Sequence, residues 1–197
     1  MNDDIKVFDK VIPDGYADAI EEDLLQQEFP WYYIDDVTNP EYGNNSGLSH
    51  VVFNHGMAPK EYYPFLKPLA YAIAEANGKP MEQLFRIRIG FLPKTDEPEY
   101  EYNTPHVDFF WPHYTACYYV NDSDGDTVFF DKTIDDIKLP EIDQTVVKHY
   151  AETTKFTEVY RSAPVKNKLC VFNGHRFHAS THPIINRKRL VITFNFT

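Results

Sequence analysis

The amino-acid sequence predicts a single domain that is mainly β, with helices in its N-terminal part. Apolar residues at helical spacing occur in roughly the first 80 residues. From residue 83 onward they form short strand-like runs separated by turn residues. Many short strands suit a double-sheet jelly roll or a closed barrel with helices on one outer face. We therefore expect one domain over residues 1–197, with helical support in roughly 1–80 and the β core in roughly 83–197.

Length and composition limit the class of protein. A chain of 197 residues, 43% hydrophobic and 16% aromatic, can bury a core without cross-links, and its apolar runs are too short to cross a membrane. The net charge of −11 argues against a nucleic-acid partner, because such binding needs many Lys and Arg contacts. The acidic start MNDDIKVFDK is unlike a signal peptide, so we expect a cytoplasmic protein whose Cys117 and Cys170 remain thiols.

Two amphipathic helices are expected before residue 80. The first lies within residues 7–27 and places four apolar residues on its buried face, namely Ala17, Ile20, Leu24 and Leu25. The apolar face of the second consists of Leu66, Leu69, Ala70 and Ile73. Because proline is tolerated only near a helix start, Pro64 and Pro68 predict that the second helix begins between Phe65 and Leu69 and ends at Ala76.

Six strands are expected in the β core. Each is a run of apolar or alternating residues, and most are bounded by turn residues. They are Leu84 to Leu92, Tyr114 to Val120, Thr127 to Phe130, Glu158 to Arg161, Lys168 to Phe172 and Leu190 to Phe196.

A histidine and an aspartate stand two residues apart in the segment Thr104-Pro105-His106-Val107-Asp108. On an extended backbone alternate side chains share a face, so His106 and Asp108 can reach one metal ion while Val107 faces away. A His-x-Asp pair on its own arises often by chance in surface loops. The pair therefore needs a third ligand from elsewhere in the chain.

His178 is the preferred third ligand. It follows a buried-strand run and lies 70 residues beyond Asp108 (178 minus 108). Seventy residues are enough for several strands that return the chain to His106 and Asp108. His175 and His182 flank it and are competing candidates. Two imidazoles and one carboxylate on one face of a metal leave three positions open, an arrangement that suits non-haem iron(II) oxygenases.

A basic residue begins the last strand of the sequence. The alternation places Arg189, Val191, Thr193 and Asn195 on one face, and Leu190, Ile192, Phe194 and Phe196 on the other. A buried guanidinium needs an anion, and it can hold a carboxylate through two parallel hydrogen bonds. Arg189 is thus a candidate for binding a dicarboxylate, whereas Arg187 and Lys188 fit the surface end of a strand.

In order along the chain, these motifs resemble the prolyl 4-hydroxylase-like branch of the 2-oxoglutarate and iron(II)-dependent oxygenases. The resemblance covers roughly the C-terminal half and consists of His106-x-Asp108, Tyr118 to Asn121, Gly125 to Phe130, Pro164 to Phe172, His178 and Arg189. It implies a distorted double-stranded β-helix fold, iron(II) held by the three ligands, and the distal carboxylate of 2-oxoglutarate held by Arg189. It also implies that Tyr119 donates its hydroxyl to that carboxylate.

Two features differ from that branch. Arg189 lies 11 residues after His178, as 189 minus 178 gives, and Arg187 at nine residues is the alternative holder of the co-substrate. Arg189 is preferred because it enters the apolar strand directly. A turn Asp124-Gly125-Asp126 stands in place of two successive glycines. We interpret residues 121–126 as a hairpin turn, because they lack the full ligand pattern of a calcium loop.

Three aromatic residues, Phe109, Phe110 and Trp111, directly follow the first two ligands. They form either a wall that faces the substrate or a hydrophobic plug over the metal. The sequence favours neither interpretation.

The sequence therefore predicts an iron(II) and 2-oxoglutarate-dependent dioxygenase that hydroxylates a peptide, with proline as the nearest analogy, or a small molecule. Its cofactors would be Fe(II), 2-oxoglutarate and dioxygen, with ascorbate as a further candidate. Asp108 favours hydroxylation, because halogenating relatives carry a small residue there that frees a metal position. The alternatives are a zinc hydrolase, which leaves Arg189 unexplained, and a jelly-roll metal-binding module without turnover. The oligomeric state is not indicated.

Overall fold

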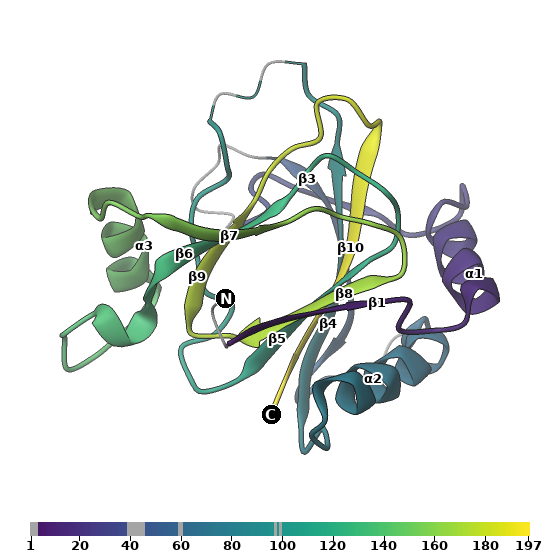
Figure 1. Cartoon of the computed structure of the whole chain (residues 1–197), viewed down its shortest axis with the longest axis horizontal. Helices are drawn as coiled ribbons and strands as arrows, with labels where there is room; N and C mark the ends of the chain where they lie inside the picture. The colour runs from purple at the N-terminus through teal and green to yellow at the C-terminus, as the bar shows by residue number, and fades with distance from the viewer. Residues whose placement is uncertain (1–3, 39–45, 59–60, 97, 99) are drawn as a thin grey trace.

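The fold of the chain consists mainly of β-strands (Figure 1). The computed structural model describes residues 4–38, 46–58, 61–96, 98 and 100–197. Within these residues the helices are α1 (Asp14–Leu24), α2 (Tyr63–Asn77), α3 (Gln144–Thr153) and the short 3-10 helix η1 (Ile134–Asp136). The strands are β1 (Ile5–Asp9), β2 (Tyr32–Ile34), β3 (Gly47–Asn54), β4 (Leu84–Pro93), β5 (Tyr114–Tyr119), β6 (Thr127–Thr133), β7 (Glu158–Ser162), β8 (Lys168–Asn173), β9 (Arg176–Ser180) and β10 (Lys188–Phe196).

The strands form two antiparallel sheets that face each other, as in a jelly roll. The larger sheet has the order β1-β8-β5-β10-β4-β3-β2, and the smaller has the order β7-β6-β9. Helices α1 and α2 lie beyond the larger sheet, and α3 lies at the opposite side of the molecule beside the smaller sheet (Figure 1). The prediction of a mainly β jelly roll with N-terminal helices is therefore confirmed.

The largest hydrophobic core lies between α1, α2 and the outer face of the larger sheet. Ile20 of α1 and Leu69 of α2 are fully buried there, together with Ile192 and Phe194 of β10. These two β10 residues belong to the apolar face that the alternation predicted. The opposite face of β10 consequently points into the space between the two sheets.

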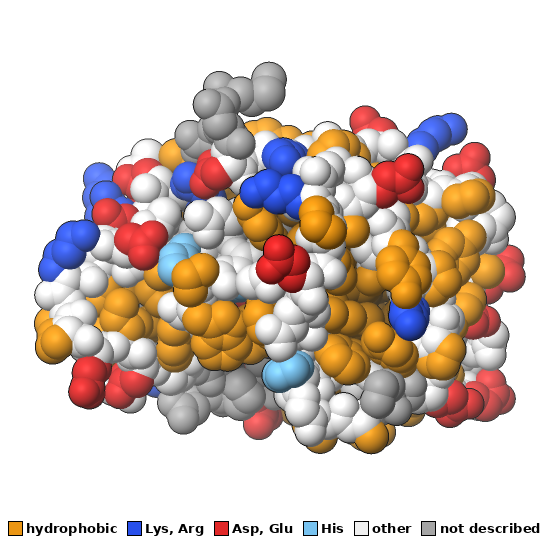
Figure 2. Space-filling model, turned by 90° about the horizontal axis from the view of Figure 1, so that it is seen from below, with side chains coloured by type: hydrophobic (Ala, Val, Ile, Leu, Met, Phe, Trp, Pro, Cys, Tyr) orange, Lys and Arg blue, Asp and Glu red, His pale blue; other side chains and the backbone are white. Residues whose placement is uncertain are grey.

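Hydrophobic side chains also remain on the surface. Figure 2 shows one face on which they form a broad band, while most Asp and Glu side chains lie toward its margins. Tyr33 of β2 is 67% exposed and Ile185 is 79% exposed. No described helix is long and apolar enough to cross a membrane.

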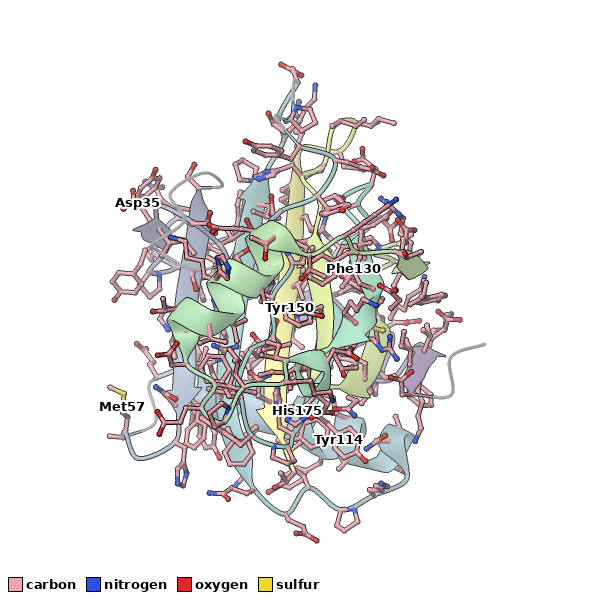
Figure 3. The ribbon with its side chains drawn as sticks, turned by 90° about the vertical axis from the view of Figure 1, so that its left-hand side faces the viewer. Asp35, Met57, Tyr114, Phe130, Tyr150 and His175 are labelled. Atoms are coloured by element: carbon pink, nitrogen blue, oxygen red, sulfur yellow. The ribbon has the colours of Figure 1, made fainter. Side chains whose placement is uncertain are left out.

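A second hydrophobic core joins α3 to the outer face of the smaller sheet. Val147 and Ala151 are four residues apart on α3 and pack against Phe130 of β6 and Phe177 of β9. Figure 3 shows α3 lying across this side of the molecule. The helix begins at Gln144 because the Asp143 carboxylate accepts a hydrogen bond from the Val146 N–H at 2.9 Å.

The division into an N-terminal helical part and a C-terminal β part is incomplete. Strands β1, β2 and β3 precede residue 80 and complete the larger sheet, while α3 and β9 were not predicted. β1 is an edge strand with mostly exposed side chains, and the register of β3 shifts between Val51 and Phe53, so neither shows a regular alternation. Pro68 lies inside α2, which begins earlier than expected, at Tyr63.

The segment 121–126 is not a hairpin turn. β5 belongs to the larger sheet and β6 to the smaller one, so this segment carries the chain from one sheet to the other. The side-chain carboxylate of Asp124 binds backbone groups of another segment. It accepts hydrogen bonds from the N–H groups of Ile184, Ile185 and Asn186 at 2.8–2.9 Å. The segment therefore holds the loop that leads into β10.

Two adjacent leucines test the packing of α1. Leu24 is fully buried, whereas Leu25, which was expected on the same face, caps the helix and is 42% exposed. Leu24→Ala should lower the free energy of unfolding by about 2–5 kcal/mol, because it leaves a cavity. Leu25→Ala should change it by about 0.5 kcal/mol or less. Urea unfolding of both variants checks this, and equal losses would contradict the packing described for α1.

Candidate functional site

His106 and His178 are held opposite each other by the backbone. The N–H of each residue donates to the carbonyl of the other, at 2.9 and 3.0 Å, in an isolated antiparallel bridge. Directly opposed residues of an antiparallel pair project their side chains to the same face. The two imidazole rings accordingly lie with their centroids 4.5 Å apart.

Asp108 completes a cluster of three metal-ligand side chains. One ligand atom from each of His106, Asp108 and His178 lies within 4.8 Å of the other two. Val107, between the first two, points away into the core beneath α3, as an extended backbone requires. Among the described residues this is the one cluster of three or more His, Cys, Asp or Glu side chains that could hold a metal ion.

The electrostatics of the three side chains suit metal ligation. Burial lowers the pKa of His106, and burial together with His106 lowers the pKa of His178 to about 4. Burial alone would raise the pKa of Asp108, but the Arg86 guanidinium and the hydrogen bond from Asn195 keep it well below its ordinary value. Near neutral pH the site therefore offers two neutral imidazoles and a carboxylate, which are the forms that bind metals.

A hydrogen-bond network orients the Asp108 carboxylate. Arg86 of β4 donates to its Oδ1, and the Asn195 side chain of β10 donates to Oδ2 at 2.8 Å. Arg86 also donates through Nε to the side-chain amide oxygen (Oδ1) of Asn195 at 3.0 Å. The strand register makes this possible, because Asn195 lies directly opposite Arg86. Arg86 was not predicted from the sequence, since only the pairing of β4 with β10 places it here.

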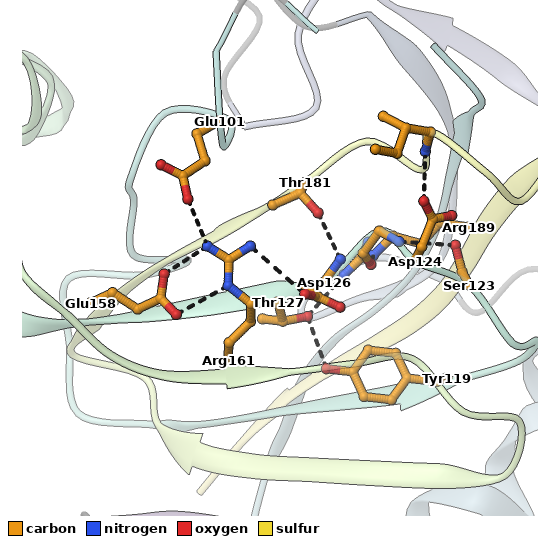
Figure 4. A network of polar contacts seen from close by, with 12 residues as sticks. Glu101, Tyr119, Ser123, Asp124, Asp126, Thr127, Glu158, Arg161, Thr181 and Arg189 are labelled. Carbon is orange, nitrogen blue, oxygen red and sulfur yellow. Dashed lines mark hydrogen bonds and ion pairs between the residues drawn. The ribbon is translucent and has the colours of Figure 1, made fainter. Parts of the chain in front are cut away.

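Arg189 lies in the same interior pocket as the three candidate ligands. It is 7% exposed, and its guanidinium donates to the Gly125 carbonyl at 2.6 Å and to the Thr127 hydroxyl at 2.9 Å (Figure 4). Among the described residues, no carboxylate lies within ion-pair distance of it. Arg187, the alternative, is exposed and does not line this pocket.

Tyr119 does not line the pocket but contacts Thr127, which does. Its side chain is fully buried, and its hydroxyl donates to the Thr127 hydroxyl oxygen at 2.9 Å (Figure 4). Burial raises its pKa above the ordinary range, so it remains a protonated donor. Thr127 lines the pocket and lies between Tyr119 and Arg189, so it is the hydroxyl group that the sequence analysis missed.

The competing histidines lie elsewhere. His175 occupies the tight turn between β8 and β9, where its Nδ1 faces Asp135. The Nδ1 of His182 lies 3.4 Å from the Pro93 carbonyl. Neither belongs to the cluster of candidate ligands, so the structure brings His178 alone of the three to His106 and Asp108.

The aromatic residues after Asp108 pack beside the site. Phe109 stacks on Trp111 with centroids 4.5 Å apart, and the Arg86 guanidinium lies over the Phe109 ring at 4.9 Å. Phe109, Phe110 and Trp111 do not line the interior pocket. This geometry favours a packing role for Phe109, because its ring covers the arginine that orients Asp108.

Gly125 allows Arg189 to approach the segment between the sheets. A Cβ atom at this position would lie 2.8 Å from the Thr181 carbonyl oxygen and 2.9 Å from the Cδ of Arg189. Gly125→Ala should therefore lower the free energy of unfolding by about 1–3 kcal/mol through overpacking. Gly15→Ala is the control, because nothing lies within 4 Å of its Cβ position in α1 and alanine favours a helix. Chemical denaturation of both variants measures this, and an unchanged stability of Gly125→Ala would contradict the close contact.

Comparison of the sequence with models of known families and with curated proteins finds no match. The fold does match solved structures. The non-heme alpha ketoglutarate dependent epimerase SnoN from nogalamycin biosynthesis superposes with a TM-score of 0.68 at 16% identity, over 99% of this chain and 78% of SnoN. A prolyl-4-hydroxylase from Pseudomonas putida has a TM-score of 0.55 at 16% identity, over 98% of this chain and 91% of that one.

HygX from Streptomyces hygroscopicus, solved with nickel, 2-oxoglutarate and hygromycin B bound, has a TM-score of 0.57 at 12% identity. The match covers 98% of this chain and 82% of HygX. The chain shares the double-stranded β-helix fold of these neighbours.

Proposed function

We propose that the protein is an iron(II) and 2-oxoglutarate-dependent oxygenase. In this proposal His106, Asp108 and His178 hold iron, and Arg189 holds the distal carboxylate of 2-oxoglutarate. One observation carries the proposal: the three candidate ligands and the buried Arg189 line the same interior pocket. A metal site and a carboxylate site in one cavity are what a co-substrate that chelates iron requires.

The donor set fits iron(II). Two neutral imidazoles and one carboxylate leave three coordination positions for exchangeable ligands, unlike a closed structural zinc site. With iron and 2-oxoglutarate bound, the site would couple oxidative decarboxylation of 2-oxoglutarate to succinate with oxidation of a second substrate. The protein's part is to keep Asp108 ionised and oriented through Arg86 and Asn195.

The surroundings of Arg189 fit a carboxylate. A guanidinium has five N–H donors, and the bonds to Gly125 and Thr127 use two of them. Two parallel hydrogen bonds to a carboxylate would offset the burial of this charge. We assign the Thr127 hydroxyl as a second contact to the same carboxylate, with Tyr119 positioning Thr127 from behind. A direct bond from Tyr119, as predicted from the sequence, would require Thr127 to move aside.

Hydroxylation is the reaction that we propose. With Asp108 as the third protein ligand, a chelating 2-oxoglutarate and dioxygen would take the three remaining positions, and none would be left for a halide. The solved neighbours act on different kinds of substrate: one is a prolyl-4-hydroxylase, and HygX was solved with hygromycin B bound. A peptide, such as a prolyl peptide, and a small molecule are therefore both retained as substrate classes. The expected compartment remains the cytoplasm, where the buried free thiols of Cys117 and Cys170 would stay reduced.

Succinate release tests the function and the ligand set together. Iron-loaded protein should convert 2-oxoglutarate to succinate, even slowly without a second substrate. His106→Ala, Asp108→Ala or His178→Ala should each reduce this rate by more than about 100-fold and lower the iron content, because each removes a direct ligand. His175→Ala and His182→Ala are the matched controls and should retain both. If the protein bound iron but released no succinate, the proposed function would be wrong. The remaining candidates would then be a metal-binding module without turnover and a zinc hydrolase.

The two arginines provide a separate test of the co-substrate site. Arg189→Ala should raise the dissociation constant of 2-oxoglutarate by roughly 30-fold or more, because a buried partner of a carboxylate is lost. Arg187→Ala, at an exposed position, should change it little. Anaerobic titration of the iron(II) protein with 2-oxoglutarate, followed by the visible charge-transfer band, measures both constants. If Arg187→Ala lost the band while Arg189→Ala kept it, the roles of the two arginines would be exchanged.

A further inference from the structure

A third arginine lies next to the candidate metal site, and the proposed function leaves it unused. Arg88 follows Arg86 by two residues on β4, so both side chains point into the space between the sheets. Both line the interior pocket and also a neighbouring hollow of about 310 Å³. The other residues around this hollow are Thr38, His106, Val107, Asp108, Gln144 and Val147.

The hydrogen-bond acceptors that the described residues offer to Arg88 are neutral. Its Nε donates to the Ser49 hydroxyl at 2.9 Å, and one terminal nitrogen donates to the Val37 carbonyl at 3.0 Å. In the described part of the chain no carboxylate lies within ion-pair distance of it, whereas Arg86 pairs with Asp108. Burial and the charge of Arg86 lower the pKa of Arg88 to about 10. Arg88 is thus a positive charge that is positioned by neutral groups and still ionised at neutral pH.

Arg88 adds a positive charge to the lining of the hollow. Asp108 and Asp36 favour this charge through the electrostatic field, whereas burial and the charge of Arg86 oppose it. An uncompensated, partly buried charge is unfavourable. The hollow beside the metal therefore favours a ligand that carries a negative charge.

We propose that Arg88 binds an oxyanion group, a carboxylate or a phosphate, of the second substrate and so holds that substrate in the hollow beside the metal. This inference rests on the proposed function and specifies its substrate class. Thr38 and Gln144, which also line the hollow, are neutral polar groups that can accompany the anion. Arg86 serves a different purpose, because its charge is already paired with Asp108. Arg88 is accordingly a specificity-determining residue, and substrates without an anionic group would bind weakly.

Anion binding tests this inference without knowledge of the substrate. The protein is loaded with zinc(II) and saturating 2-oxoglutarate, and inorganic sulfate or acetate is titrated at constant ionic strength by calorimetry. Wild-type protein should bind one of these anions saturably, with sulfate preferred for a phosphate site and acetate for a carboxylate site. Arg88→Gln should weaken this binding by about tenfold or more, because a charged donor is lost. Arg88→Lys, which keeps the charge, should retain most of it, and exposed Arg187→Gln should retain all of it.

Two results would overturn the inference. One is the absence of saturable anion binding to the wild-type protein, or equal binding by wild type and Arg88→Gln. The other comes from the anaerobic titration of the iron(II) protein with 2-oxoglutarate. If Arg88→Gln lost as much affinity for 2-oxoglutarate as Arg189→Ala, Arg88 would hold the co-substrate rather than the second substrate. Failure of the proposed function gives a different result, because the wild-type protein itself would then not bind 2-oxoglutarate. The sulfate and acetate titrations of protein loaded with zinc(II) alone would still decide whether Arg88 binds anions.

Discussion

The reciprocal backbone hydrogen bonds between His106 and His178 are the interaction on which the candidate site depends. They tie the segment after β4 to β9, and Asn103 extends the pairing through its N–H and its side chain, which donate to Ser180 at 2.8 and 2.9 Å. β9 is in turn paired with β6 in the smaller sheet. The backbone pairing therefore places both imidazoles on the same face, where they lie together as candidate ligands.

The fold separates the parts that stabilise it from the parts that carry charge. Its two larger hydrophobic cores lie on the outer faces of the sheets, one under α1 and α2 and the other under α3. A smaller cluster that includes Phe129 and Phe172 fills part of the space between the sheets. Polar and charged side chains can occupy the remaining space because the outer cores supply most of the apolar burial. Such burial is tolerated where each group has hydrogen-bond partners, as Asp108 and Arg189 do.

The sequence was sufficient wherever the relevant pattern was local. The alternation of the last strand placed Arg189 and Asn195 inside, and the spacing of His106 and Asp108 placed both on one face. Contacts that depend on strand register could not be predicted in this way. Arg86 meets Asp108 only because β4 pairs with β10 so that Arg86 lies opposite Asn195. Thr127 separates Tyr119 from the pocket because β5 and β6 belong to different sheets, which the hairpin interpretation excluded.

Net charge was also a poor guide to the chemistry of the interior. The chain carries a formal charge of −11, which taken alone would disfavour a dianionic co-substrate or an anionic substrate. At physiological ionic strength, however, salt screens exposed charges beyond about 8 Å, whereas groups inside the protein are screened much less. A bound anion would therefore respond mainly to Arg86, Arg88 and Arg189, which line one pocket with Asp108 as the acidic side chain among its lining residues. The lining of this pocket holds three arginines and one aspartate although the molecule as a whole is acidic, and the proposed ligands would meet this lining rather than the average charge of the surface.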